Sequence, residues 1–281
     1  MGTTSEPEQD ALVSYYASGS LVQRIKAGLT SLGVSPPVDL KTLAPLDEFH
    51  IGGRSATVPF LRRLGIGAGD RVLDLGCGLG GPARFAAHST GAQVTGIDLT
   101  EEFVTAGQVL TDMTGLVGQV DLVQGSILDL PFAKASFDAA YMIHVGMNIA
   151  DKAGIAAQVA RVLKPGGVFG IYDVMRVSEG DIRFPVPWAN DESHSALASP
   201  ETYRAALQQA GFRIEHQQDL TGFAQDFFAR MAADPRPKGG PPPLGLHLVM
   251  GVDTAAKMRN LAGNIADGYV APIEMIARLK T

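Results

Sequence analysis

The segment that most constrains this 281-residue chain is RVLDLGCGLGGPARF, at residues 71–85. It begins with a short apolar run typical of a buried parallel strand. Pro82 then suits the first turn of a helix. The order predicts a strand, a tight turn whose backbone a ligand can approach closely, and a helix, although a turn without any ligand would use the same residues. Four glycines form the turn: Gly76, Gly78, Gly80 and Gly81.

An acidic residue within this segment favours a bound ligand over a ligand-free turn. Asp74 stands at the end of the apolar run, just before the glycines. A carboxylate at that place is costly unless something pairs with it, and a cationic group of a ligand is a natural partner. We therefore expect a bound molecule that carries a positive charge.

Two nucleotide cofactors use a glycine turn of this kind. Gly76, Gly78 and Gly81 satisfy the GxGxxG pattern of dinucleotide sites. Asp98 ends the next apolar run, at the spacing of a ribose-binding carboxylate. A pyrophosphate would lie beside the negative charge of Asp74, whereas S-adenosylmethionine (SAM) offers a ribose and an ammonium group without phosphates. SAM therefore fits better, and a nicotinamide-dependent oxidoreductase is the alternative.

Five segments in order resemble the motifs of class I SAM-dependent methyltransferases. They are DLGCGLGG, GIDLT, LPF, FDAAYMIH and VLKPGG, and the resemblance covers roughly residues 45–215. LDEFHIGGRSAT and FPVPWA are more narrowly similar to segments of sarcosine, dimethylglycine and phosphoethanolamine N-methyltransferases. The resemblance implies an enzyme that transfers a methyl group from SAM to a small molecule. A SAM-binding protein without activity is a further hypothesis.

The alternation of strand and helix patterns from Arg71 onward predicts an α/β fold with a doubly wound, mostly parallel sheet. The resemblance implies a Rossmann-like sheet of seven strands. Strands are expected at residues 71–75, 93–97, 119–123, 138–143, 167–173, 212–219 and 269–278. We expect an N-terminal helical cap segment at residues 1–64, the core at 65–220, a helical lid insertion at 221–268 and the last strand of the core at 269–281.

Composition and charge argue against several classes of function. The net charge is −6, without a basic stripe, which argues against a nucleic-acid partner. Cys77 is the only cysteine, so neither an internal disulfide nor a thiol metal site is expected. No apolar run approaches the ~18 residues of a membrane span, and the first residues lack the pattern of a signal peptide. We expect a cytoplasmic enzyme without a metal or a membrane partner, and its oligomeric state stays open.

The resemblance assigns roles at the polar end of the cofactor. It implies that Asp74 and the Gly76 backbone hold the methionine end of SAM, with Gly78 in the same turn. Asp98 would accept the two ribose hydroxyls, because a carboxylate offers two acceptor oxygens to two donors. The alternative for Asp98 is a cap of the following helix, a role that Thr100 already suits.

The resemblance also assigns residues around the adenine. Leu99 would lie against the adenine ring. Ser126 and Ile127 stand where the family usually has an acidic residue at the adenine amino group. Ser126 offers only a neutral acceptor there, unless the backbone makes this contact.

His144 is the first candidate for chemistry. Methyl transfer is an in-line displacement, so positioning contributes most, roughly 7–11 kcal/mol. A base is needed only if the acceptor must lose a proton. His144 follows the strand expected to point at the methyl group, where it would also contact SAM, and its ordinary pKa suits a base. A packing histidine is the alternative. By analogy with the phosphoethanolamine enzymes, Tyr16 on an N-terminal helix would close over the substrate.

Three residues are candidates for binding the acceptor. His50, beside a glycine pair, either lines a pocket mouth or belongs to a capped helix start. Asn148 could orient a polar group, and Trp188, the only tryptophan, either packs or forms an aromatic wall for a cationic amine. We expect an amine acceptor, with N-methylation ahead of O- or C-methylation. An acceptor with a carboxylate or phosphate would need a cationic clamp from Arg54, Arg84 or Arg183.

Overall fold

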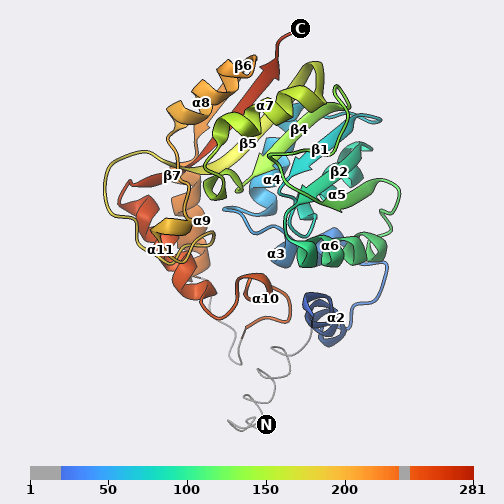
Figure 1. The fold of residues 1–281 in the computed structure, drawn as a ribbon. Helices are drawn as coiled ribbons and strands as arrows, with labels where there is room; N and C mark the ends of the chain where they lie inside the picture. Colours follow the sequence, from blue (N-terminus) through green and yellow to red (C-terminus); the bar gives the residue numbers. More distant parts are fainter. Residues whose placement is uncertain (1–19, 234–240) are drawn as a thin grey trace, which may run out of the picture.

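One seven-stranded sheet organises residues 20–233 and 241–281, the parts of the chain that this computed structural model describes (Figure 1). The strand order is β3-β2-β1-β4-β5-β7-β6, and only β7 runs antiparallel to its neighbours. The expected Rossmann-like, mostly parallel sheet is thereby confirmed. The strands are β1 (Arg71–Leu75), β2 (Gln93–Asp98), β3 (Val120–Gln124), β4 (Phe137–Ile143), β5 (Leu163–Arg176), β6 (Phe212–Asp219) and β7 (Val270–Leu279).

Helices cover both faces of the sheet (Figure 1). Successive strand residues point to opposite faces. In β1, Val72 packs against α4 and α5, whereas Leu73 packs against α7 and α8 on the other face. The described helices are α2 (Leu21–Ser31), α3 (Leu40–Asp47), α4 (Arg54–Leu64), α5 (Gly81–Thr90), α6 (Glu101–Met113), α7 (Lys152–Val162), α8 (Pro200–Gln209), α9 (Thr221–Ala233), α10 (His247–Met250) and α11 (Thr254–Ala266).

The glycine turn between β1 and α5 has the predicted form. Gly76 and Gly78 have positive φ values of 71° and 51°, which glycine adopts most readily. A Cβ added at Gly76 would lie 2.4 Å from a methyl group of Val145, so the close approach at this position requires glycine. The Gly76 amide donates to the carbonyl of Ile97 at 2.8 Å, which ties the turn to the end of β2.

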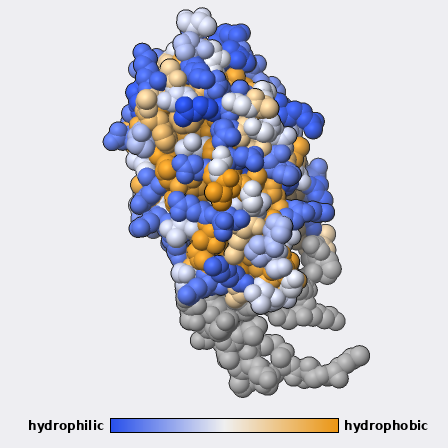
Figure 2. All heavy atoms as spheres, turned by 90° about the vertical axis from the view of Figure 1, so that its right-hand side faces the viewer, coloured by the Kyte–Doolittle hydropathy of each residue, from blue (hydrophilic) through white to orange (hydrophobic). Residues whose placement is uncertain are grey.

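Two further groups of helices lie beside the core. α2 and α10 pack on α6 in one apolar cluster that includes Ile25, Leu110 and Leu248. α9 and α11 pack together in another, around Phe228 and Leu261. Figure 2 shows the face on the right of Figure 1, where apolar residues lie in several groups separated by hydrophilic ones. None of the described helices is both long and apolar enough to cross a membrane.

Candidate active site

A cavity of about 840 Å³ lies at the carboxyl ends of β1, β2 and β4. β1 lies between β2 and β4, where the strand order reverses and where open α/β sheets bind ligands. The volume is within the range of about 300–1,000 Å³ typical of ligand pockets. Tyr16 lies outside the described residues. All other predicted site residues line the cavity: Asp74, Gly76, Gly78, Asp98, Leu99, Ser126, Ile127, His144, His50, Asn148 and Trp188.

Asp74 is a buried acid at the floor of this cavity. It pairs in register with Tyr141 of β4, whose hydroxyl donates to Asp74 Oδ2 at 3.1 Å. The pKa of Asp74 is raised to about 8, mainly by burial and in part by the nearby Asp98 carboxylate, while the Tyr141 hydrogen bond and Arg84 act in the opposite direction. A carboxyl group in this setting is stabilised as an anion by a cationic ligand group.

The raised pKa of Asp74 predicts that SAM binding depends on pH. A ligand ammonium favours the ionised carboxylate, so binding should release a proton wherever the free protein holds it, which is below pH 8. SAM affinity should therefore rise about tenfold per pH unit from pH 6 towards pH 7.5. Calorimetry in two buffers of different ionisation enthalpy measures the proton release. Asp74→Asn should remove the pH dependence; wild-type affinity that is constant over this interval would contradict the assignment.

Asp98 holds the glycine turn as well as facing the cavity. Its Oδ2 accepts the Gly78 amide at 2.8 Å, and its Oδ1 accepts the Thr100 amide at 2.9 Å. Asp98 therefore also has the structural role that was the alternative to ribose binding, because it supports the start of α6 (Glu101–Met113). Each carboxylate oxygen keeps a second lone pair, so both can still accept a ribose hydroxyl.

The predicted adenine residues lie along one rim of the cavity. Leu99 is an apolar side chain that is 73% exposed beside the carboxyl end of β2. Ser126 Oγ accepts the amide of Leu128 at 3.1 Å, so its hydroxyl supports a local turn. Ile127 is buried against the core. Their contacts with adenine stay predictions.

His144 has an unusual conformation directly after β4. Its φ is 53°, which is strained for a residue with a side chain. Its amide donates to the Tyr172 carbonyl at 2.7 Å, and its ring lies 4.9 Å from the Tyr172 ring. Nε2 is buried without a hydrogen-bond partner among the described residues. Burial and the neighbouring His50 hold the pKa of His144 well below 6.5, so its imidazole is neutral at pH 7.

His50 belongs to a hydrogen-bonded group in the wall of the cavity. Its Nε2 lies 2.9 Å from Thr57 Oγ1 and 3.1 Å from the Gly53 carbonyl. Thr57 donates to Glu48 Oε2 at 2.6 Å, and Arg54 pairs with Oε1 of the same carboxylate. Burial lowers the pKa of His50 to about 4, and it raises the pKa of Glu48 against the opposing effects of Thr57 and Arg54.

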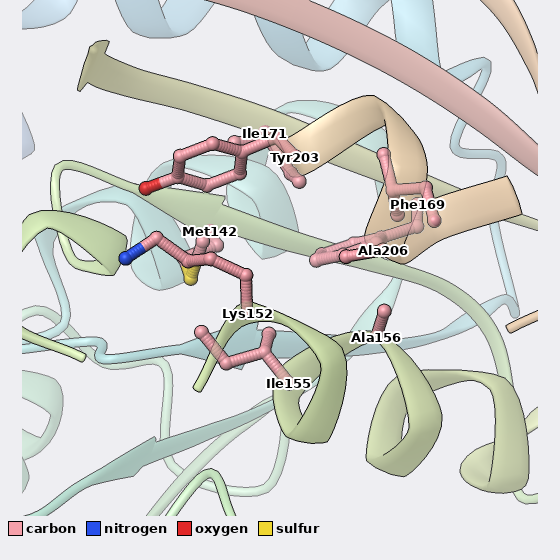
Figure 3. Close-up of a pocket in the computed structure, with 9 residues that line it drawn as sticks. Met142, Lys152, Ile155, Ala156, Phe169, Ile171, Tyr203 and Ala206 are labelled. Carbon is pink, nitrogen blue, oxygen red and sulfur yellow. The ribbon is translucent and has the colours of Figure 1, made fainter. Parts of the chain in front are cut away.

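The loop that carries Asn148 is fixed from behind. This loop forms a short 3-10 helix, Gly146–Asn148, and Asn148 donates to the Val145 carbonyl at 3.1 Å. Lys152 Nζ donates to the carbonyls of Gly146 at 2.9 Å and Ala196 at 2.8 Å. Figure 3 shows the Lys152 amine and the Tyr203 hydroxyl at the same end of a second cavity of about 10 Å³. That space holds at most one water molecule, so it is not a ligand pocket.

The outer wall of the main cavity is apolar. Trp188 donates its Nε1–H to Ser195 Oγ at 3.0 Å and, like Phe227, packs against the apolar cluster of α9 and α11. The described part of the expected lid supplies most of the remaining wall, and whether it closes over a ligand stays a prediction. Its lining residues are Phe227, Met231, Leu246, Met250, Met258 and Leu261.

The family model described as a methyltransferase domain matches residues 73–171. This chain contains a SAM-dependent methyltransferase domain. The matched residues include Asp74, the glycine turn, Asp98 and His144, so the domain and the cavity floor coincide. The expected class and its SAM cofactor are confirmed, ahead of the nicotinamide alternative.

A curated relative of the methyltransferase is named for carbon methylation. The sterol 24-C-methyltransferase ERG6B of Gibberella zeae is 34% identical over 165 residues, which cover 56% of this chain and 43% of that protein. The chain therefore matches less than half the length of this relative. That name refers to methylation of carbon, whereas we expected an amine acceptor.

Solved structures of methyltransferases share the fold. Geranyl diphosphate C-methyltransferase from Streptomyces coelicolor A3(2) has a TM-score of 0.65 and 19% identity and covers 99% of both chains. Phosphoethanolamine N-methyltransferase 2 of Haemonchus contortus has a TM-score of 0.65 and 21% identity and covers 84% of this chain and 54% of that chain. At these identities the likeness shows the fold alone.

Proposed function

We propose that this methyltransferase transfers the methyl group of SAM to a carbon atom of an apolar, unsaturated small molecule. The observation that carries the proposal is the division of the cavity into an acidic floor and an apolar outer wall. Asp74 and Asp98 suit the polar cofactor, whereas the outer wall offers mainly aromatic and methionine side chains to the acceptor. The names of the sterol and geranyl diphosphate relatives support the same acceptor chemistry.

The arginines expected to clamp an anionic acceptor have other partners. Among the described residues that line the cavity there is no lysine or arginine. A carboxylate- or phosphate-bearing amine of the sarcosine or phosphoethanolamine type would therefore meet acidic groups and no described cation. The three arginines pair with carboxylates: Arg54 with Glu48, Arg84 with Asp47 and Arg183 with Asp267.

The outer wall suits a reaction that passes through a cation. When the π electrons of an alkene take up the methyl group, positive charge develops on the neighbouring carbon. The faces of Trp188 and Phe227 attract such a charge, and the polarisable side chains of Met250 and Met258 adapt to an irregular apolar molecule. In-line positioning of the alkene against the sulfonium supplies most of the rate.

A panel of acceptors with methyl-labelled SAM tests the proposal. Cycloartenol, geraniol, geranyl diphosphate, sarcosine and phosphoethanolamine are each incubated with the protein, and methylated products are identified by mass spectrometry. We expect a methylated product from cycloartenol or geraniol and less from geranyl diphosphate, whose diphosphate meets the acidic residues of the cavity. Methylation of sarcosine or phosphoethanolamine, with none of the three alkenes converted, would refute the proposal.

Replacing Trp188 by alanine probes the acceptor wall separately. The change removes an aromatic face from the outer cavity and leaves the acidic floor intact. We expect the KM for the alkene to rise at least tenfold, since aromatic side chains contribute strongly to apolar pockets, while the Kd for SAM measured by calorimetry stays within twofold. Equal losses for both ligands would place Trp188 outside the acceptor site.

A further inference from the structure

The group Glu48, Thr57 and His50 has the arrangement of an oriented base. Its three members lie in the segment between α3 and α4 and the first turn of α4 (Arg54–Leu64). His50 and Glu48 both line the cavity, and Thr57 lies between them, fully buried. Nothing in the overall fold requires this arrangement, because other apolar contacts already fix α4 to the sheet through Phe60 and Leu64.

Hydrogen bonding fixes the tautomer of His50. The Gly53 carbonyl can only accept, so His50 Nε2, at 3.1 Å from it, carries the proton. The Thr57 hydroxyl gives its own proton to Glu48 at 2.6 Å in preference to the Gly53 carbonyl at 3.3 Å, so Thr57 Oγ1 accepts from His50. Nδ1 is therefore the nitrogen with the free lone pair.

His50 is better placed than His144 to hold a proton. The charged and titratable groups that face it are Glu48 and Arg54 from its own segment, His144 after β4 and Tyr172 of β5. Its Nε2 lies 3.9 Å from Glu48 Oε2, so an imidazolium at His50 has a carboxylate beside it. His144 Nε2 is buried without a partner among the described residues. The rings beside an imidazolium there, among the described residues, are those of the neutral His50 and of Tyr172.

We propose that His50 accepts the proton which the acceptor loses after methyl transfer, and that Glu48 and Thr57 hold its imidazole in the accepting tautomer. The inference rests on the proposed function. The π pair of the alkene forms the bond to the methyl carbon, and the carbon–sulfur pair stays on sulfur. A C–H pair next to the cationic carbon then restores a double bond, and the proton passes to His50 Nδ1. Glu48 and Thr57 are positioning residues, because they act through His50.

Product identity tests the role of His50. In His50→Asn the cation has lost its base, so water captures it and a methylated alcohol replaces part of the methylated alkene. Turnover to the alkene should fall by about 10²- to 10⁴-fold. In His144→Asn we expect slower turnover with the alkene still the product. The acceptor in these assays is cycloartenol. If the wild type does not convert cycloartenol, the acceptor is whichever of geraniol and geranyl diphosphate it does convert.

Kinetic isotope effects test the positioning residues. The labelled substrates are the same alkene, deuterated at every carbon next to its double bond, and SAM with a deuterated methyl group. The ratio of kcat for the unlabelled to kcat for the labelled substrates should be larger in Thr57→Val and in Glu48→Gln than in the wild type. Thr57→Ser should restore the wild-type value, because it keeps the hydroxyl. Thr111→Val is the control, since Thr111 is also buried and donates to the Gly107 carbonyl at 2.9 Å, away from the cavity lining. Thr111 Oγ1 also accepts from Arg84 Nη1 at 3.2 Å, so this control includes the loss of one buried hydrogen bond to a charged group. The Kd for SAM confirms that each variant is folded.

The outcomes separate the two proposals. If the wild type converts an alkene and His50→Asn gives the same methylated alkene at an undiminished rate, the role of His50 is wrong and the proposed function stands. An isotope effect in Thr57→Val equal to that of the wild type would overturn the roles of Thr57 and Glu48. A wild type that converts none of the alkenes overturns both proposals together.

Discussion

Asp98→Ala is expected to weaken SAM binding by about 100-fold. The variant loses the carboxylate that is predicted to accept two ribose hydroxyls, and a hydrogen bond to a charged group contributes about 1.5–3 kcal/mol. It also frees the Gly78 amide, which Asp98 accepts at 2.8 Å, so part of the glycine turn loses its support. Calorimetric titration of the purified variant with SAM measures the effect.

Two controls separate these contributions of Asp98. Asp98→Asn keeps one acceptor oxygen and the size of the side chain, so its loss should be smaller than that of the alanine variant. Asp121→Ala removes an exposed carboxylate from the neighbouring strand β3, outside the cavity lining, and should leave the Kd unchanged. An unaltered Kd in Asp98→Ala would remove Asp98 from the cofactor site.

The part of the site that the sequence predicts best is the part formed by consecutive residues. The strand, the glycine turn, the helix and the next acidic strand end occupy residues 71–98, and the structure reproduces them within a residue. Short-range patterns govern this region, because glycine conformation and apolar runs are local properties. The positions of Asp74 and Asp98 at one edge follow from the parallel sheet.

The contacts that tune these residues could not be predicted in the same way. The hydroxyl of Tyr141 reaches Asp74 from 67 residues away, through strand register alone. Thr57 was not singled out in the sequence, because a threonine in a helix has no pattern that shows a buried hydrogen bond to Glu48. Tertiary contacts decide both of these partners.

The elements missed or misplaced by sequence reasoning are short or irregular. α3 (Leu40–Asp47) has eight residues and contains Pro45, which weakens a helical pattern. α10 (His247–Met250) has four residues. β5 begins at Leu163, before the expected start at residue 167, and continues through Pro165.

The expectation of an amine acceptor came from short motifs. The outer cavity wall is built largely from α9–α11 (within residues 221–266), where the sequence offered no motif.

A buried ion pair between Asp47 and Arg84 gives the largest predicted effect on stability. Arg84 was expected as a possible substrate clamp, but it is 0% exposed and its Nη2 lies 2.7 Å from Asp47 Oδ2. Its Nη1 donates to the Gly107 carbonyl at 3.1 Å and to Thr111 Oγ1 at 3.2 Å, so it joins α3, α5 and α6. Asp47→Ala leaves this guanidinium buried without its counter-ion, and the free energy of unfolding should fall by about 3–5 kcal/mol.

Urea unfolding of three variants distinguishes this effect from simple loss of packing. The double variant Asp47→Leu with Arg84→Met replaces both charges by apolar groups, so it should be more stable than Asp47→Ala, because no unpaired charge stays buried. Lys164→Ala breaks the half-exposed pair with Asp138 and should lower the free energy of unfolding by less than about 1 kcal/mol.

Because α3 leads directly into Glu48 and His50, Asp47→Ala should also weaken the cavity wall and lower turnover beyond its effect on SAM binding. Equal stability of Asp47→Ala and the wild type would show that the buried arginine has another source of compensation.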